Sequence, residues 1–124
     1  MKVIIAGSRT ITDPLELEKA IKDSGFTITE VISGGATGPD SLGAAWANEN
    51  NIPVGFYYPD WKQFGKKAGP IRNSLMAADA GSDGGLIALW DGSSKGTKDI
   101  ITKCEGKGMK VYIHIIKNKE DNDG

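Results

Sequence analysis

Five short apolar runs alternate with longer segments that carry apolar residues at helical spacing, and this alternation constrains the fold more than any other feature of the chain. The first run, residues 2–6, is rich in β-branched residues and has little apolar–polar alternation, which is typical of a strand buried on both faces. Strands that alternate with helices form parallel sheets through right-handed crossovers. We therefore predict an α/β domain with a mostly parallel five-stranded sheet and helices on both faces. The expected strands are 2–6, 29–33, 53–58, 85–90 and 110–116.

The segments between these runs have the start signals and the periodicity of helices. In the first, Asp13 is the expected N-cap and Pro14 stands at the first helical position. We expect the other helices to begin near residue 39 and to span about 68–79 and 96–106. The stretch 59–69 is expected to be a long loop, and long loops in compact domains are often functional. The residues expected to face the core are Leu17, Ala20, Ile21, Leu42, Ala45, Trp46, Ile71, Leu75, Ile100, Ile101 and Cys104.

A length of 124 residues fits one domain, which we place at residues 1–116, and the polar stretch 117–124 is expected to be a disordered tail. The 15 basic residues are balanced by 16 acidic ones, so there is no overall positive field and nucleic acid is not an expected partner. The single cysteine, Cys104, cannot form an internal disulfide, and no spacing of Cys and His indicates a metal site. No signal peptide or membrane span is expected, so we predict a cytoplasmic protein without a membrane partner, a metal or a cofactor.

Ligands of parallel α/β sheets bind beyond the carboxyl ends of the strands, so the loops at that edge form the candidate site. These loops are 7–10, 33–40, 60–73 and 91–99, and each combines glycine with charged or hydroxyl residues. Two of them, 33–40 and 91–99, run into expected helix N-termini, where free N–H groups and the helix dipole favour an anion. Their glycines either let the backbone approach a phosphate or simply form tight turns, and the sequence leaves both interpretations open.

The chain has two arginines, Arg9 and Arg72, against 13 lysines, and both arginines fall in these loops. An arginine offers two parallel N–H donors to a phosphate or carboxylate, so both are expected to neutralise an anionic ligand. Asp40 is expected either to cap its helix and tie down its loop or to contact a ribose hydroxyl. Trp61 either plugs a hydrophobic gap or stacks on a base. No Ser–His–Asp or Cys–His arrangement is recognisable, so any catalysis would depend on carboxylates or a positioned water.

Four ordered motifs resemble the SLOG superfamily, in particular its small stand-alone members in bacteria and phages. The motifs are "GSRTITD", "SGGATGPDSLGAAWANENNIPV", "DWKQFGKKAGPIRNSLM" and "LWDGSSKGTKDII". The second is also similar to the "S-G-x-A-x-G-I-D" segment of the DNA-processing protein DprA, with Pro39 in place of the apolar residue. This resemblance implies a single Rossmann-like three-layer domain with a pocket for nucleotides or nucleotide-derived ligands.

The third and fourth motifs are similar to those of the LOG phosphoribohydrolases, which cleave the N-glycosidic bond of nucleoside monophosphates. Asn73 replaces the lysine that follows the arginine in their "R-K-x-x-M" motif, and Ile100 replaces the last residue of their "P-G-G-x-G-T-x-x-E" motif. The resemblance implies that this missing glutamate is catalytic. Asp99 stands one residue early, which turns a helical side chain by about 100°. We therefore expect a binding protein rather than an enzyme, with a LOG-like nucleotide hydrolase as the alternative.

The resemblance implies that the ligand is an ADP-ribose-like molecule or a cyclic or linear signalling nucleotide, which the protein senses or sequesters. Because phages carry such proteins, one expected role is the capture of a defence signal. A homodimer or higher homo-oligomer is expected, since neighbouring subunits can complete the site in the LOG group. The residues expected to bind the ligand and its phosphates are Gly7, Ser8, Arg9, Ser33, Gly34, Gly35, Ala36, Thr37, Gly38, Asp40, Trp61, Arg72, Asn73, Asp91, Gly92, Ser94, Lys95, Gly96 and Thr97.

Overall fold

Strands and helices alternate along the chain in the computed structural model, which describes residues 1–117. The elements are β1 (Lys2–Gly7), α1 (Pro14–Ser24), β2 (Glu30–Ser33), α2 (Pro39–Glu49), β3 (Val54–Phe56), α3 (Trp61–Phe64), the 3-10 helix η1 (Gly65–Lys67), α4 (Ala68–Ala80), β4 (Gly85–Trp90), α5 (Lys95–Gly106) and β5 (Lys110–Ile115). Apart from Lys117, the expected C-terminal tail lies outside the described residues. Within residues 1–117, no helix combines the length and the apolar character needed to cross a bilayer.

All five strands are parallel, in the order β3-β2-β1-β4-β5, which confirms the predicted α/β class and a parallel sheet. The central strand β1 pairs with β2 on one side, where Val3 lies opposite Val31, and with β4 on the other, where Val3 lies opposite Gly85. The chain therefore builds outwards from β1 to β3 and then crosses back to β4. This reversal creates a topological switch point between the carboxyl ends of β1 and β4.

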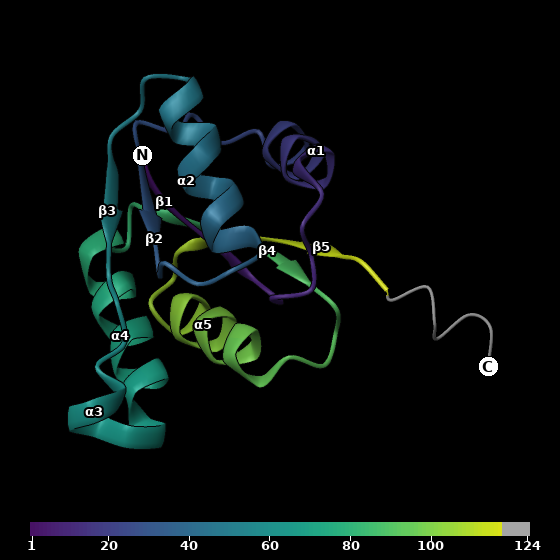
Figure 1. Cartoon of the computed structure of the whole chain (residues 1–124). Coiled ribbons are helices and arrows are strands. Elements are labelled where there is room, and N and C mark those ends of the chain that lie inside the picture. The colour runs from purple at the N-terminus through teal and green to yellow at the C-terminus, as the bar shows by residue number, and fades with distance from the viewer. Residues whose placement is uncertain (118–124) are drawn as a thin grey trace.

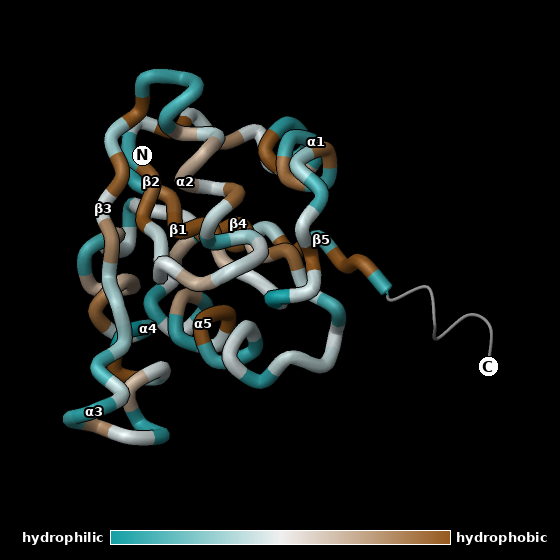
Figure 2. Tube along the Cα trace, viewed as in Figure 1, coloured by the Kyte–Doolittle hydropathy of each residue, from teal (hydrophilic) through white to brown (hydrophobic). Residues whose placement is uncertain are grey.

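Helices cover both faces of the sheet, α1 and α2 on one face and α4 and α5 on the other (Figure 1). Successive residues of β1 point to opposite faces, so Ile5 packs with the α1 and α2 side and Ile4 with the α4 and α5 side. Figure 2 shows the strands mostly in brown, in agreement with a core that follows the sheet. The predicted core residues that are fully buried are Leu17, Ala20, Ile100, Ile101 and Cys104. The two layers of helices around one sheet confirm the three-layer architecture.

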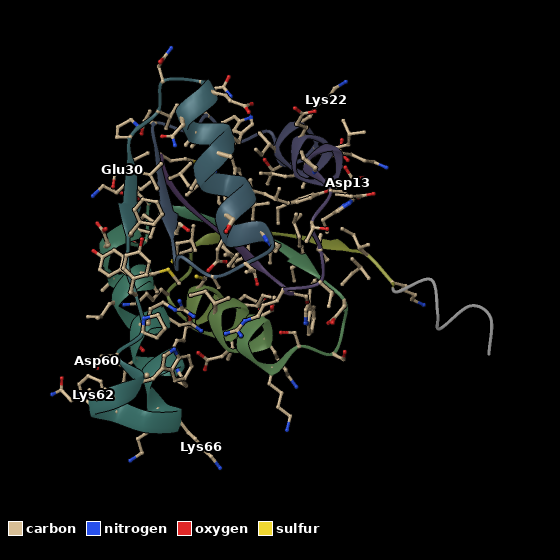
Figure 3. All side chains as sticks on the ribbon, viewed as in Figure 1. Asp13, Lys22, Glu30, Asp60, Lys62 and Lys66 are labelled. Carbon is tan, nitrogen blue, oxygen red and sulfur yellow. The ribbon has the colours of Figure 1, made fainter. Side chains whose placement is uncertain are left out.

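The predicted start of the first helix is also confirmed. The Asp13 carboxylate accepts a hydrogen bond from the Leu15 N–H at 3.0 Å, and Pro14 follows at the first helical position. The helix ends at Gly25, whose φ of 70° is the left-handed conformation that glycine adopts most easily. The labelled Asp13 and Lys22 can be followed in Figure 3 toward opposite ends of α1, where their charges complement the helix dipole.

Two predicted core residues are exposed. Ala45 lies on the outer face of α2, because that helix packs through Gly43 and Ala47 instead. Leu75 is 53% exposed, because α4 buries the face that carries Met76 and Ala77.

The expected long loop over 59–69 is partly helical. Asp60 accepts a hydrogen bond from the Gln63 N–H at 3.0 Å and so caps the short helix α3, and η1 leads directly into α4. Figure 3 shows the labelled Asp60, Lys62 and Lys66 at the end of the molecule that α3 and η1 form. The expectation of a structureless loop is therefore wrong, although the segment remains exposed from Trp61 to Lys67.

Candidate ligand-binding site

A pocket of about 530 Å³ opens at the switch point, beyond the carboxyl ends of β1 and β4. Its walls come from the loops after β1, β2 and β4 and from α3, α4 and the first turns of α5. Small-molecule sites typically occupy about 300–1,000 Å³, so this pocket has room for a small organic ligand. The predicted site residues that line it are Gly7, Ser8, Arg9, Ala36, Asp40, Trp61, Arg72, Asn73, Asp91, Ser94, Lys95, Gly96 and Thr97. Those that do not line it are Ser33, Gly34, Gly35, Thr37, Gly38 and Gly92.

The N-terminus of α5 presents free backbone donors to the pocket. Ser94 is the N-cap, and its hydroxyl accepts hydrogen bonds from the Thr97 N–H at 3.5 Å and from the Thr97 hydroxyl at 3.1 Å. The N–H groups of Lys95 and Gly96 have no hydrogen-bond partner among residues 1–117, and both residues line the pocket. Free N–H groups at the positive end of a helix dipole attract an anion.

Asp91 holds the loop that leads into α5. Its Oδ1 accepts hydrogen bonds from the N–H groups of Ser93 and Ser94, both at 2.8 Å, while its own N–H donates to the hydroxyl of Ser8 at 3.0 Å. The bonds from the two N–H groups hold the pKa of Asp91 below its ordinary value, because they stabilise the ionised form. The carboxylate therefore fixes the loop, and Ser8 ties that loop to the end of β1.

Arg72 lies on α4 and is held by two hydrogen bonds. Its Nη1 donates to the carbonyl oxygen of Gly34 at 2.7 Å, and its Nε donates to Oδ1 of Asn73 at 3.0 Å. Burial lowers the pKa of Arg72, the charge of Asp40 opposes this effect, and the charge of Arg9 adds to it. Nη2 has no partner among the described residues, so a half-buried cation with free donors faces the pocket.

Asn73 connects Arg72 to α5. Its Nδ2 donates to the Gly96 carbonyl oxygen at 3.3 Å and to Oδ2 of Asp99 at 2.9 Å, while Oδ1 accepts from Arg72. The side chain is buried, with 5% exposed. Because all of these bonds are internal, Asn73 positions the neighbouring groups and offers little to a ligand directly.

Asp40 is the most deeply buried carboxylate in the pocket wall, with 5% of the residue exposed. Its Oδ2 accepts a hydrogen bond from the Ala36 N–H at 3.2 Å. Burial raises the pKa of Asp40, while the hydrogen bond from Ala36 and the charges of Arg72 and Arg9 act in the opposite direction. The residue ties down its own loop, as one of the two sequence interpretations proposed, and it also reaches the pocket.

The glycines of the loop 33–40 make room for protein groups. A side chain at Gly34 would collide with the guanidinium of Arg72 and would lie 2.7 Å from Oδ2 of Asp40. At Gly35, where φ is 74°, it would collide with the ring of Tyr58. The hydroxyl of Ser33 is also engaged internally, since it donates to the Asp40 carbonyl oxygen at 3.0 Å. These contacts explain why the glycine-rich centre of the loop does not line the pocket.

The exposed rim of the pocket carries Arg9, Lys95 and Trp61. Arg9 forms no ion pair or side-chain hydrogen bond with residues 1–117. Trp61 is 51% exposed, which does not fit a buried hydrophobic plug. A half-exposed indole at a pocket rim can instead stack on a flat ring.

The residues expected to bind the ligand do not include seven residues that line the pocket, which are Ala6, Thr10, Gly69, Pro70, Met76, Asp99 and Ile100. Four of them, Thr10, Gly69, Pro70 and Asp99, lie within the predicted candidate loops. Gly69 and Met76 lie three residues before and four residues after Arg72, so helical spacing could have placed them on the same face. Asp99 reaches the pocket wall despite its shift by one residue, but Lys103 holds its carboxylate in an ion pair of 2.7 Å. Ile100 is 2% exposed and adds an apolar surface.

No group of three or more His, Cys, Asp or Glu side chains within residues 1–117 could hold a metal ion. The polar groups of the pocket are two arginines, the free N–H donors at the start of α5 and the carboxylates of Asp40, Asp91 and Asp99. They stand beside an apolar wall. Arginines and free N–H groups suit a phosphate, and carboxylates suit hydroxyl or amino donors.

Comparison with known proteins agrees with this architecture. Residues 1–64 match the family described as "YspA, cpYpsA-related SLOG family". The chain is also 33% identical over 119 residues to the Gene 61 protein of Mycobacterium phage D29, in an alignment that covers 89% of this chain and 93% of the phage protein. No solved structure matches the chain significantly. With a Rossmann-like sheet, a pocket at its switch point and a match over half of its length, this chain belongs to the YspA, cpYpsA-related SLOG family.

Proposed function

We propose that this protein binds a nucleotide or a nucleotide-derived ligand in the pocket at the switch point. The observation that carries the proposal is the convergence of Arg72 with the free N–H groups of Lys95 and Gly96 on one pocket. Asn73 joins these elements through bonds to the Arg72 side chain and the Gly96 carbonyl oxygen. A phosphate between them receives charge-assisted hydrogen bonds from both sides.

The remaining walls suit the rest of a nucleotide. Trp61 stands at the rim with half of its surface exposed, where its indole stacks on a base. Met76 and Ile100 supply apolar contacts on the inner side. Arg9, in the loop after β1, is a second cation at the pocket. It suits a ligand with more than one phosphate, such as an ADP-ribose-like molecule.

Binding without turnover is the role we favour, because two of the three pocket aspartates already bind groups of the protein itself. Asp91 accepts N–H groups of its own loop, and Asp99 is paired with Lys103 and Asn73. The protein then senses or sequesters a signalling nucleotide. A relative is the Gene 61 protein of a phage, and capture of a defence signal is one form of the role that we propose.

A LOG-like hydrolase is the second candidate, and Asp40 is the observation that favours it. Its Oδ1, like Oδ2 of Asp91, has no donor within residues 1–117, and Asp40 is the more deeply buried of these two pocket aspartates. A carboxylate beside the scissile bond is the group that such a hydrolysis needs.

The first experiment is mass spectrometry of small molecules released from the denatured protein, followed by incubation of those molecules with fresh protein. We expect a nucleotide derivative that is retained and returned unchanged. Free base or ribose phosphate that accumulates with time would favour the hydrolase. Protein that carries no such molecule and binds no candidate nucleotide in calorimetry would contradict both functions.

Arg72→Ala tests the phosphate site directly. Loss of a half-buried guanidinium is expected to weaken binding of the recovered nucleotide by about 2–4 kcal/mol, measured by calorimetry. Lys110→Ala is the control, because Lys110 is an exposed cation at the opposite end of the strands. Equal affinity of wild-type protein and a folded Arg72→Ala variant would remove Arg72 from the site.

A further inference from the structure

Asp40 leaves one carboxylate oxygen available inside the pocket wall. Oδ2 accepts the hydrogen bond from Ala36, but Oδ1 has no donor among residues 1–117. No fully buried side-chain oxygen or nitrogen in this part of the chain lacks a partner, so Oδ1 is not sealed in the interior. Because Asp40 lines the pocket, Oδ1 is accessible to a ligand there.

Two arginines lie near Asp40, but neither donates a hydrogen bond to its Oδ1. The charges of Arg72 and Arg9 favour the ionised carboxylate, although neither arginine forms an ion pair with it within 4.0 Å. The Asp40 side chain is largely buried, so a ligand that places a hydrogen-bond donor on Oδ1 is favoured over one that covers this oxygen without a donor. A second phosphate is disfavoured there, because it would face a negative charge.

The position of Asp40 relative to Arg72 indicates which part of a nucleotide supplies that donor. A side chain built at Gly34 would touch both the Arg72 guanidinium and Oδ2 of Asp40, so the two groups flank the same glycine. In a nucleotide the sugar is attached directly to the phosphate, whereas the base lies further away. A phosphate on Arg72 therefore brings the sugar, rather than the base, next to Asp40.

We propose that Asp40 accepts a hydrogen bond from a sugar hydroxyl of the ligand and so makes the pocket selective for ribonucleotides over deoxynucleotides. This inference rests on the proposed nucleotide-binding function and adds the chemical class of the sugar. Nucleotides that carry an additional phosphate on the 2′ or 3′ hydroxyl are excluded by the same carboxylate.

The test is calorimetric titration of wild-type protein with the adenosine, guanosine, cytidine and uridine 5′-monophosphates and with their 2′,3′-dideoxy counterparts. We expect the ribonucleotide of the preferred base to bind about 10-fold to 100-fold more tightly than its dideoxy form, the range for hydrogen bonds to a charged group. Equal binding of the two forms overturns the inference and leaves the proposed function intact. Failure of every titrated nucleotide to bind overturns the inference, and it overturns the proposed function as well if the purified protein also retains no nucleotide derivative.

Asp40→Asn then assigns the selectivity to this residue. The amide oxygen can keep the bond from Ala36, while an NH₂ group replaces Oδ1, so the acceptor is lost without a change in size. We expect the ratio of the two affinities to fall to about one, with the dideoxy form bound as tightly as before or more tightly. The control is Asp83→Asn, which removes an exposed charge at the other end of the strands and should keep the full ratio. A folded Asp40→Asn variant that still prefers the ribonucleotide to the dideoxynucleotide as strongly as wild-type protein would show that Asp40 does not cause the selectivity. If the wild-type protein distinguishes the bases but not the sugars, Asp40 accepts a hydrogen bond from a base amino group instead.

Discussion

The loop after β2 and the loop after β4 look alike in the sequence, since both contain glycine and lead into a helix at the same edge of the sheet. In the first, the glycines accommodate the Arg72 guanidinium and the Tyr58 ring, and the Asp40 carboxylate is only partly hydrogen-bonded. In the second, Gly96 has open space around its α-carbon, and Asp91 holds its own loop through two backbone N–H groups that donate to Oδ1. The two loops therefore present different groups to a ligand. The loop after β2 presents the carboxylate of Asp40, and the loop after β4 presents the backbone N–H groups at the start of α5.

This difference shows that glycine content alone does not locate a phosphate. A glycine that is surrounded by protein atoms is needed for packing, and one that borders an open pocket is available to a ligand. Gly34 and Gly96 are examples of the two cases, and they give the most direct test of the comparison.

The largest effect is expected from Gly34→Ala. The added methyl group displaces the Arg72 guanidinium and breaks its hydrogen bond to the Gly34 carbonyl oxygen, at an expected cost of about 2–3 kcal/mol in the free energy of unfolding, measured in urea. Gly96→Ala is the matched variant, and it should be neutral or stabilising by about 0.5 kcal/mol, because alanine favours a helix. Equal losses in the two variants would contradict the division between the loops.

Ser94→Ala is expected to have an intermediate effect. The hydroxyl of Ser94 accepts from the Thr97 N–H and hydroxyl at the start of α5, so its removal should cost about 1 kcal/mol of unfolding free energy. Ser82→Ala, at an exposed serine that forms no side-chain hydrogen bond with residues 1–117, is the control. A loss in the control as large as that in Ser94→Ala would show that the cap does not hold the loop.

The smallest effects are expected from the two aspartates, and they should have opposite signs. Asp40 has a pKa raised above the ordinary value of 3.8, so its ionised form lowers stability at neutral pH and this penalty is relieved as the pH falls through the raised pKa. Asp91 has a pKa below 3.8, so its stabilisation is present above 3.8 and is lost as the pH falls through the lowered value. Asp40→Asn should therefore raise the midpoint of thermal unfolding at pH 7, and Asp91→Asn should lower it.

Thermal scans of both variants and of wild-type protein between pH 3 and pH 7 check this prediction. The difference in unfolding midpoint between each variant and wild-type protein should become smaller as the pH falls. For Asp40→Asn this change should begin at a higher pH than for Asp91→Asn, because the pKa of Asp40 is raised and that of Asp91 is lowered. Destabilisation by Asp40→Asn at pH 7 would mean that the carboxylate serves the fold. Stabilisation together with weaker ribonucleotide binding would mark Asp40 as a residue that is kept for function at a cost in stability.

The sheet could be predicted from the sequence because strands of a parallel sheet that are buried on both faces consist of continuous apolar runs. The helices could be predicted because the segments between these runs have apolar residues at helical spacing. The same alternation of strands and helices predicted that the candidate loops lie together beyond the carboxyl ends of the strands. The helix α3 was missed, although Asp60 three residues before Gln63 is a capping signal that predicts a helix start. Leu75 was misplaced because a short helix has several apolar faces and only packing decides which one is buried.

The site was harder to predict than the fold because its residues meet only through tertiary contacts. The bond from Arg72 to the Gly34 carbonyl oxygen joins residues 38 positions apart, and that from Asn73 to Asp99 joins residues 26 apart. Residue types could indicate that Arg72 and Asp40 belong to a polar pocket. They could not show that Asn73 is fully occupied by its neighbours while Asp40 keeps a free oxygen, since that depends on the distances in the folded chain.

The central place of β1 has a consequence for synthesis on the ribosome. This strand is synthesised before the other four, yet one of its edges has no partner until β4, which begins at Gly85, has been made. Until then the nascent chain exposes a buried strand with open hydrogen-bonding groups, which is the kind of edge that recruits other chains into aggregates. Newly made chains that stop before β4 should therefore depend on chaperones, and the completed chain should not.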